Sequence, residues 1–122
     1  MLLVDEPKYK MAIYENKKQV HIQVIGFIPE NLVEPYLIAL EQTVSKVNRA
    51  QYSLVVDATN QSPLPSKTSA GLGGTFMFYA SFGFKYNWII YPKSKIASVQ
   101  IRNALETIDF PGKAIHSASE IK

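Results

Sequence analysis

YSLVVDATNQSPLPSKTSAGLGG, residues 52–74, joins a short apolar run to a glycine-rich segment through a polar loop. The run YSLVVD (52–57) has the length and the continuous apolar character of a strand buried inside a parallel sheet. After the loop, the serine and threonine side chains at 66–69 are helix-capping types, and they predict a helix that continues to about Phe82. A buried strand that leads into a helix is typical of an α/β fold with a partly parallel sheet.

The sequence before this stretch predicts a β-hairpin followed by a helix. KMAIYE (10–15) alternates apolar and polar residues, and QVHIQVIGFI (19–28) does the same after a polar turn. From Leu32 onward the apolar residues recur every three or four positions, which indicates an amphipathic helix. Asn31 is the expected N-cap of this helix. Pro35 is expected in its first turn, where a missing N–H costs no helical hydrogen bond.

The sequence after the glycines predicts two more strands and a further helix. FKYNWIIYP (84–92) is rich in aromatic and β-branched residues, as strands are, and Gly83 is the expected C′ residue of the helix before it. Ser94 is expected to cap the next helix. KAIH (113–116) predicts a short last strand, and SASE (117–120) has the spacing of a capping box. The residues of the capped helix that are expected to face the core are Ile96, Val99, Ala104, Leu105 and Ile108.

Together these elements predict one domain over residues 1–122, in the order β-β-α-β-α-β-α-β. The length suits a single hydrophobic core. Strands separated by helices imply parallel, right-handed crossovers, and the opening hairpin adds an antiparallel pair. The expected fold is therefore α/β, with a mixed sheet of about five strands and helices packed on it.

Composition argues against several classes of protein. Hydrophobic residues make up 47% of the chain and charged residues 19%, which is a globular balance. The absence of cysteine excludes disulfides, thiolate metal sites and a cysteine nucleophile. Thirteen basic residues give a net charge of +3, but they are spread along the chain, so no nucleic-acid partner is expected. No apolar run approaches the roughly 20 residues of a membrane span, and the sequence predicts a cytoplasmic protein.

The glycine-rich segment does not fit a standard nucleotide-binding loop. Lys67 precedes the glycines, whereas a Walker A loop needs its lysine after them, and GLGG (71–74) lacks the spacing of a dinucleotide fingerprint. His21 and His116 have no second ligand at metal spacing. No cofactor, metal or catalytic activity is therefore expected. Two interpretations of Asp57 remain open: it is either a functional group at the carboxyl edge of the sheet or a turn-forming aspartate.

TSAGLG (68–73) resembles the switch motif of the STAS family, the anti-sigma-factor antagonists, in which a serine is phosphorylated by an anti-sigma kinase. Ser69 matches that serine, Gly71 and Gly73 match the motif glycines, and Thr68 stands where the family has an aspartate. Residues 52–60 resemble the family's strand with its terminal Asp-x-Ser/Thr, here Asp57 and Thr59. The resemblance extends by element order over most of residues 10–121.

The resemblance implies a STAS-like fold and a regulatory, non-catalytic domain of the bacterial cytoplasm that binds a protein partner. That partner would be an anti-sigma-factor-like kinase or a related regulator. Ser69 is the implied phosphorylation site, since a phosphate there would meet the positive end of a helix. The implied switch loop and partner surface comprise Asp57, Thr59, Thr68, Gly71 and Gly73. A small-molecule or lipid-binding module remains the alternative, with an apolar ligand between the glycine-rich helix start, Asp57 and the aromatic residues that follow. The identity of the partner and the oligomeric state stay open.

Overall fold

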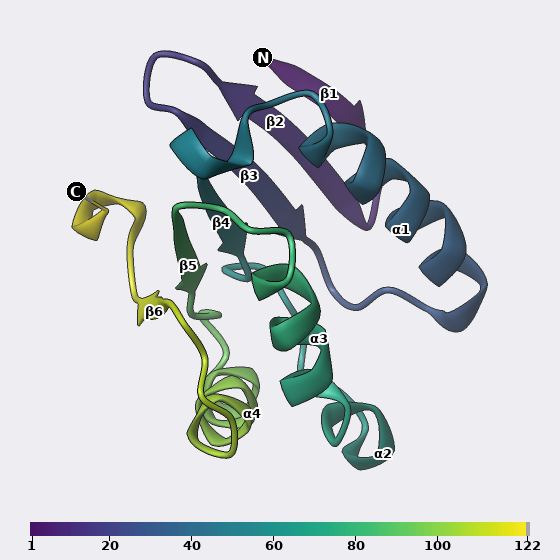
Figure 1. The fold of residues 1–122 in the computed structure, drawn as a ribbon. Coiled ribbons are helices and arrows are strands. Elements are labelled where there is room, and N and C mark those ends of the chain that lie inside the picture. Colours follow the sequence, from purple (N-terminus) through teal and green to yellow (C-terminus); the bar gives the residue numbers. More distant parts are fainter. Residues whose placement is uncertain (122) are drawn as a thin grey trace.

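The computed structural model describes residues 1–121, which form one six-stranded sheet with helices packed on it (Figure 1). The strands lie side by side in chain order, β1 to β6. The pairs β1–β2 and β2–β3 are antiparallel, and β3–β4, β4–β5 and β5–β6 are parallel. The strands are β1 (Leu2–Asp5), β2 (Tyr9–Tyr14), β3 (Gln19–Val24), β4 (Ser53–Asp57), β5 (Tyr86–Ile90) and β6 (Lys113–Ile115). The α-helices are α1 (Glu30–Val44), α2 (Ser66–Ser69), α3 (Leu72–Ala80) and α4 (Lys95–Glu106). Two short 3-10 helices are η1 (Arg49–Gln51) and η2 (Ala118–Glu120).

The α/β class and the mixed sheet are confirmed, but the sheet has a sixth strand that the sequence analysis missed. LLVD at the N-terminus is short and does not alternate, so nothing in its own pattern indicates a strand. It becomes one by pairing with β2, where Leu2 lies opposite Ala12 and Asp5 lies opposite Lys10. Such an edge strand depends on its neighbour rather than on its own propensity.

One face of the sheet carries the main core. Each crossover from β3 to β6 joins neighbouring parallel strands, so right-handed connections place the intervening helices on the same side. Leu40 of α1, Phe76 of α3 and Ile101 of α4 belong to a single buried cluster, and Figure 1 shows α1 and α3 together in front of the strands. Among residues 1–121, the other face has only a small cluster around Val55, against which Ile121 packs. We call this second side the open face.

The start of α1 differs from the expectation. The helix begins at Glu30, preceded by Pro29, and no side chain caps it, so Asn31 is not the N-cap. Pro35 consequently lies inside the helix, beyond its first turn. A proline there removes the bond that its N–H would donate to the carbonyl of Asn31. Both residues are exposed, so water can satisfy that carbonyl.

The helix expected to run to Phe82 is two helices. It breaks between α2 and α3, where Gly71 has φ −91° and ψ 0°, and neither helix has a side-chain cap bond at its start. The expected capping role of the hydroxyl residues at 66–69 is therefore wrong. Gly83 has a left-handed φ of +81°, but Ser81 is the C-cap of α3, so Gly83 lies one position beyond the expected C′ site.

The predicted cap of α4 is confirmed, whereas its inward face is shifted. The Ser94 hydroxyl accepts a hydrogen bond from the Ala97 N–H at 3.2 Å. Ala97 and Ile101 are the buried residues, while Ile96 and Val99 are 65% and 40% exposed. The predicted capping box at 117–120 is also present, over the short helix η2.

Candidate functional site

A cavity of about 480 Å³ opens between α1 and α3 at the carboxyl ends of β3 and β4. We call it the apolar pocket. Parallel strands end at the same edge of a sheet, and open α/β sheets place their ligand sites outside those ends. The lining residues are Val24, Phe27, Ile28, Val33, Tyr36, Leu37, Val56, Ala58, Gln61, Leu64, Thr68, Gly71, Leu72, Gly74, Thr75, Phe76, Phe78 and Tyr79.

The walls of the apolar pocket carry no formal charge. Apart from backbone groups, their polar atoms belong to Gln61, two threonines and two tyrosines. Phe27 and Val33 both line the pocket and are 42% and 41% exposed, so part of its apolar wall is open to solvent. The pocket therefore presents hydrocarbon surface to whatever enters it.

Two tyrosine hydroxyls meet between α1 and α3. The hydroxyls of Tyr36 and Tyr79 share a hydrogen bond, and both residues are buried. Burial raises the pKa of Tyr79 to about 12. Burial and the neighbouring Tyr79 raise the pKa of Tyr36 well above its usual value. The ring of Tyr9 packs edge-on against Tyr36, with 5.2 Å between centroids. Both hydroxyls therefore stay neutral, and each has the other as its hydrogen-bond partner.

Asp57 has the turn-forming role that the sequence left open. Its Oδ1 accepts hydrogen bonds from the N–H of Thr59, at 2.9 Å, and from the Thr59 hydroxyl. This arrangement is an Asx turn that ends β4. Neither residue lines the apolar pocket.

The motif residues Thr68 and Gly71 line the pocket, whereas Ser69 does not. Ser69 is half-buried at the end of α2, and its hydroxyl donates to the carbonyl of Ser66 at 3.0 Å. Ser69 was expected at the positive end of a helix, but it is the last residue of α2, before the break at Gly71.

Gly73 has a packing role. A Cβ there would lie 3.2 Å from Cγ2 of Ile108, just beyond α4, so the glycine lets α3 approach α4 closely. The sequence predicts that glycines destabilise this helix. It does not show that Ile108 packs against position 73, because that contact exists only in the folded chain.

The two histidines lie apart from the pocket. His21 is on β3, where Nε2 is 2.9 Å from the side-chain oxygen of Gln19, and burial lowers its pKa despite the opposing field of Asp57. His116 stacks on Tyr91. Among residues 1–121, no three His, Asp or Glu side chains are grouped as metal ligands would be. Over the same residues, no helix combines the length and apolar character that crossing a membrane requires.

The sequence analysis missed the tyrosine pair and most of the pocket wall. Tyr36 and Tyr79 fit the apolar stripes of their helices and so were expected only as core residues. The signal in the sequence was Gly26 before Phe27, because a glycine inside a strand pattern often marks a bend. In the structure Gly26 has φ +69°, and Phe27 is 42% exposed.

No protein-family model, curated protein or solved structure matches this chain.

Proposed function

We propose that this protein is a non-catalytic binding domain whose apolar pocket takes an uncharged small molecule or a lipid chain. The observation that carries the proposal is the pocket itself, with a volume of about 480 Å³ and walls without charged residues. Ligand pockets commonly have volumes of ~300–1,000 Å³ and mostly apolar walls.

The polar groups of the pocket narrow the ligand class. The tyrosine hydroxyls are neutral and already bonded to each other, so they do not attract an ion. An ionised ligand headgroup would enter an apolar space without a counter-charge, which is costly. A neutral ligand that is mainly hydrocarbon avoids this cost, and any polar end that it has can be directed to Gln61 or Thr68 at the wall.

Gly74 offers a way to block the pocket without disturbing the fold. It lines the pocket, and a Cβ at this position meets no heavy atom within 4 Å. We expect Gly74→Trp to lower the affinity for a neutral apolar dye such as Nile red at least tenfold, because the indole occupies space at the opening. Gly74→Ala is the matched control, and it should bind normally while stabilising α3 by about 1 kcal/mol.

Fluorescence titration of the three proteins checks this prediction, and native mass spectrometry of the purified protein reports any ligand that is retained. Equal dye affinity in wild-type and Gly74→Trp proteins would contradict a binding role for the pocket.

A second function, a STAS-like regulatory domain that binds a protein partner and is switched at Ser69, is supported by the position of the motif. TSAGLG follows β4 and forms the surface between α2 and α3, with Thr68 and Gly71 exposed. In this proposal the partner is an anti-sigma-factor-like kinase in the bacterial cytoplasm. It approaches Asp57, Thr59 and the motif at the carboxyl edge of the sheet, and a phosphate on Ser69 repels it.

Paired substitutions of Ser69 test the switch. We expect Ser69→Asp to weaken partner capture at least tenfold, because it places a negative charge in the interface, while Ser69→Ala binds as wild type does. The Ala protein loses only one exposed hydrogen bond, so its stability should change by less than about 1 kcal/mol. Pull-down from the native host followed by quantitative mass spectrometry provides the measurement. If both variants capture the same proteins as wild type, the switch is refuted.

A further inference from the structure

Five basic side chains converge at the end of the sheet opposite the apolar pocket. They come from the β2–β3 turn, the segment after α1 and the residue before β5, and all five are exposed. We call this group the basic edge. Its members are Lys17, Lys18, Lys46, Arg49 and Lys85.

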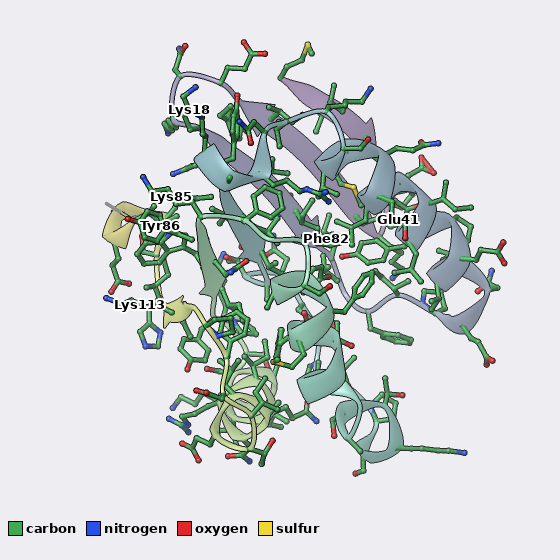
Figure 2. The ribbon with its side chains drawn as sticks, viewed as in Figure 1. Lys18, Glu41, Phe82, Lys85, Tyr86 and Lys113 are labelled. Carbon is green, nitrogen blue, oxygen red and sulfur yellow. The ribbon has the colours of Figure 1, made fainter. Side chains whose placement is uncertain are left out.

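Backbone hydrogen bonds tie these segments together. The Ser53 N–H donates to the carbonyl of Lys18 at 2.8 Å, and the Lys85 N–H donates to the carbonyl of Arg49 at 3.1 Å. Lys17 and Lys46 line one shallow hollow of about 540 Å³. In Figure 2, Lys18 and Lys85 lie along one side of the molecule.

Among residues 1–121, none of the five cations of the basic edge forms an ion pair. The one ion pair among residues 1–121 joins Lys10 to Asp5, away from this edge. Glu15 is the single acidic residue that lines the hollow. Five exposed cations without an ion-pair partner among these residues leave a positive field that favours a polyanion.

Exposed aromatic rings lie beside these cations on the open face. One row across the sheet joins Tyr14, Gln19, Ser53 and Tyr86 through their strand pairings. Tyr14 and Tyr86 are 43% and 54% exposed, and three strand spacings place them about 14 Å apart. Lys17 Nζ lies 6.0 Å from the centre of the Tyr14 ring, and Lys85 Nζ lies 5.4 Å from that of Tyr86.

The next row of the open face continues the pattern. It joins His21, Val55, Trp88 and Lys113, so two half-buried ring systems and an exposed cation follow the tyrosines. Figure 2 shows Tyr86 and Lys113 on the same side as the basic edge.

We propose that the basic edge and the adjoining open face bind single-stranded nucleic acid. Cations that follow a backbone and aromatic rings on which bases stack are the two elements of such sites. Between Tyr14 and Tyr86 lie the polar side chains of Gln19 and Ser53, which suit base edges. The centre of a protein–protein interface is instead apolar, and a membrane-inserting surface needs protruding apolar groups.

This inference reverses the expectation from the sequence. The basic residues are spread along the chain, and no run of them indicates a nucleic-acid surface. The fold brings residues 17, 49 and 85 to one edge because the parallel strands all start there.

Fluorescence anisotropy with a labelled oligouridylate of about 12 nucleotides tests the proposal, since site sizes for such surfaces are ~4–16 nucleotides. With five phosphate contacts the log–log slope of affinity against salt should be about −3.5, which is a roughly 100-fold loss between about 50 and 200 mM salt.

Charge reversal locates the site. Lys46→Glu/Lys85→Glu should lower the affinity at least 30-fold. Lys67→Glu/Lys95→Glu is the matched control, because it makes the same change in net charge with two exposed lysines outside the basic edge. Tyr86→Ala should cost about tenfold through lost stacking, whereas Phe27→Ala, which removes a ring of 42% exposure elsewhere, should cost nothing. Circular dichroism confirms that each variant is folded.

Three results would overturn the proposal. The first is the absence of saturable oligonucleotide binding in low salt, and the second is an equal loss of affinity in both double variants. The third is binding to phosphatidylserine vesicles or polyglutamate with the same affinity as the oligonucleotide, which would assign the surface to a membrane or an acidic peptide instead.

Discussion

Gly112→Ala is expected to lower the free energy of unfolding by about 3 kcal/mol, the upper end of what overpacking usually costs. Gly112 lies just before β6 and packs against the backbone of β5. A Cβ there would collide with the carbonyl oxygen of Asn87 and would lie 2.8 Å from the Asn87 Cβ and 2.6 Å from Cε2 of Phe110. A backbone oxygen cannot rotate away as a side chain can, so β5 and β6 have to separate.

Urea denaturation followed by circular dichroism measures this loss, and Gly74→Ala is its control. The two substitutions add the same methyl group, but the Cβ at Gly74 meets no atom within 4 Å. Gly112→Ala should shift the midpoint to lower urea, and Gly74→Ala should raise it. Equal midpoints for the two variants would show that β6 does not pack on Asn87 as described.

The second large effect is a loss of stability at alkaline pH caused by the tyrosine pair. The pKa of Tyr79 is about 12 in the folded protein, against a usual value of 10.0. Because the folded-state pKa is raised, the unfolded chain releases the proton first as the pH increases. The stabilisation is complete below about pH 10 and is lost between about pH 10 and 12. At ~1.4 kcal/mol per pKa unit, Tyr79 alone contributes about 3 kcal/mol of this loss.

Urea titrations at a series of pH values from about 9 to 12 measure this dependence. Tyr36→Phe/Tyr79→Phe keeps both rings and removes both hydroxyls, so its stability should fall less over that range. Tyr79→Phe alone leaves the buried hydroxyl of Tyr36 without its partner, which costs about 1–3 kcal/mol already at neutral pH. If the double variant loses as much stability as wild type on the way to pH 12, other groups cause the alkaline loss.

Local patterns in the sequence predicted the elements that depend on local periodicity. The hairpin of β2 and β3, the buried β4 and the Ser94 cap all follow from residues close together in the chain. The strand β1 does not, because LLVD becomes a strand only by bonding to β2. The break at Gly71 was missed for a related reason, since the chain has to turn there for α3 to pack on the sheet, and that requirement belongs to the tertiary fold.

The two sites were less predictable than the elements. The apolar pocket combines Phe27, Val33 and Leu64 with the motif segment, which are far apart in sequence. The general position beside the glycine-rich helix start was predicted, but Asp57 was expected in the site and lies outside it. Its carboxylate is engaged by Thr59, a local bond that the sequence offered only as one of two alternatives.

The length of β4 sets the distance between the basic edge and the apolar pocket. Its first residue, Ser53, is bonded to Lys18 of the basic edge, and Val56 near its other end lines the apolar pocket. Five residues in extended conformation span about 16 Å. An apolar ligand and a nucleic-acid strand bound at the two ends would therefore be held a fixed, short distance apart without competing for space. Under the two binding proposals, this small domain is a bivalent tether that keeps the two molecules at a high effective concentration relative to each other.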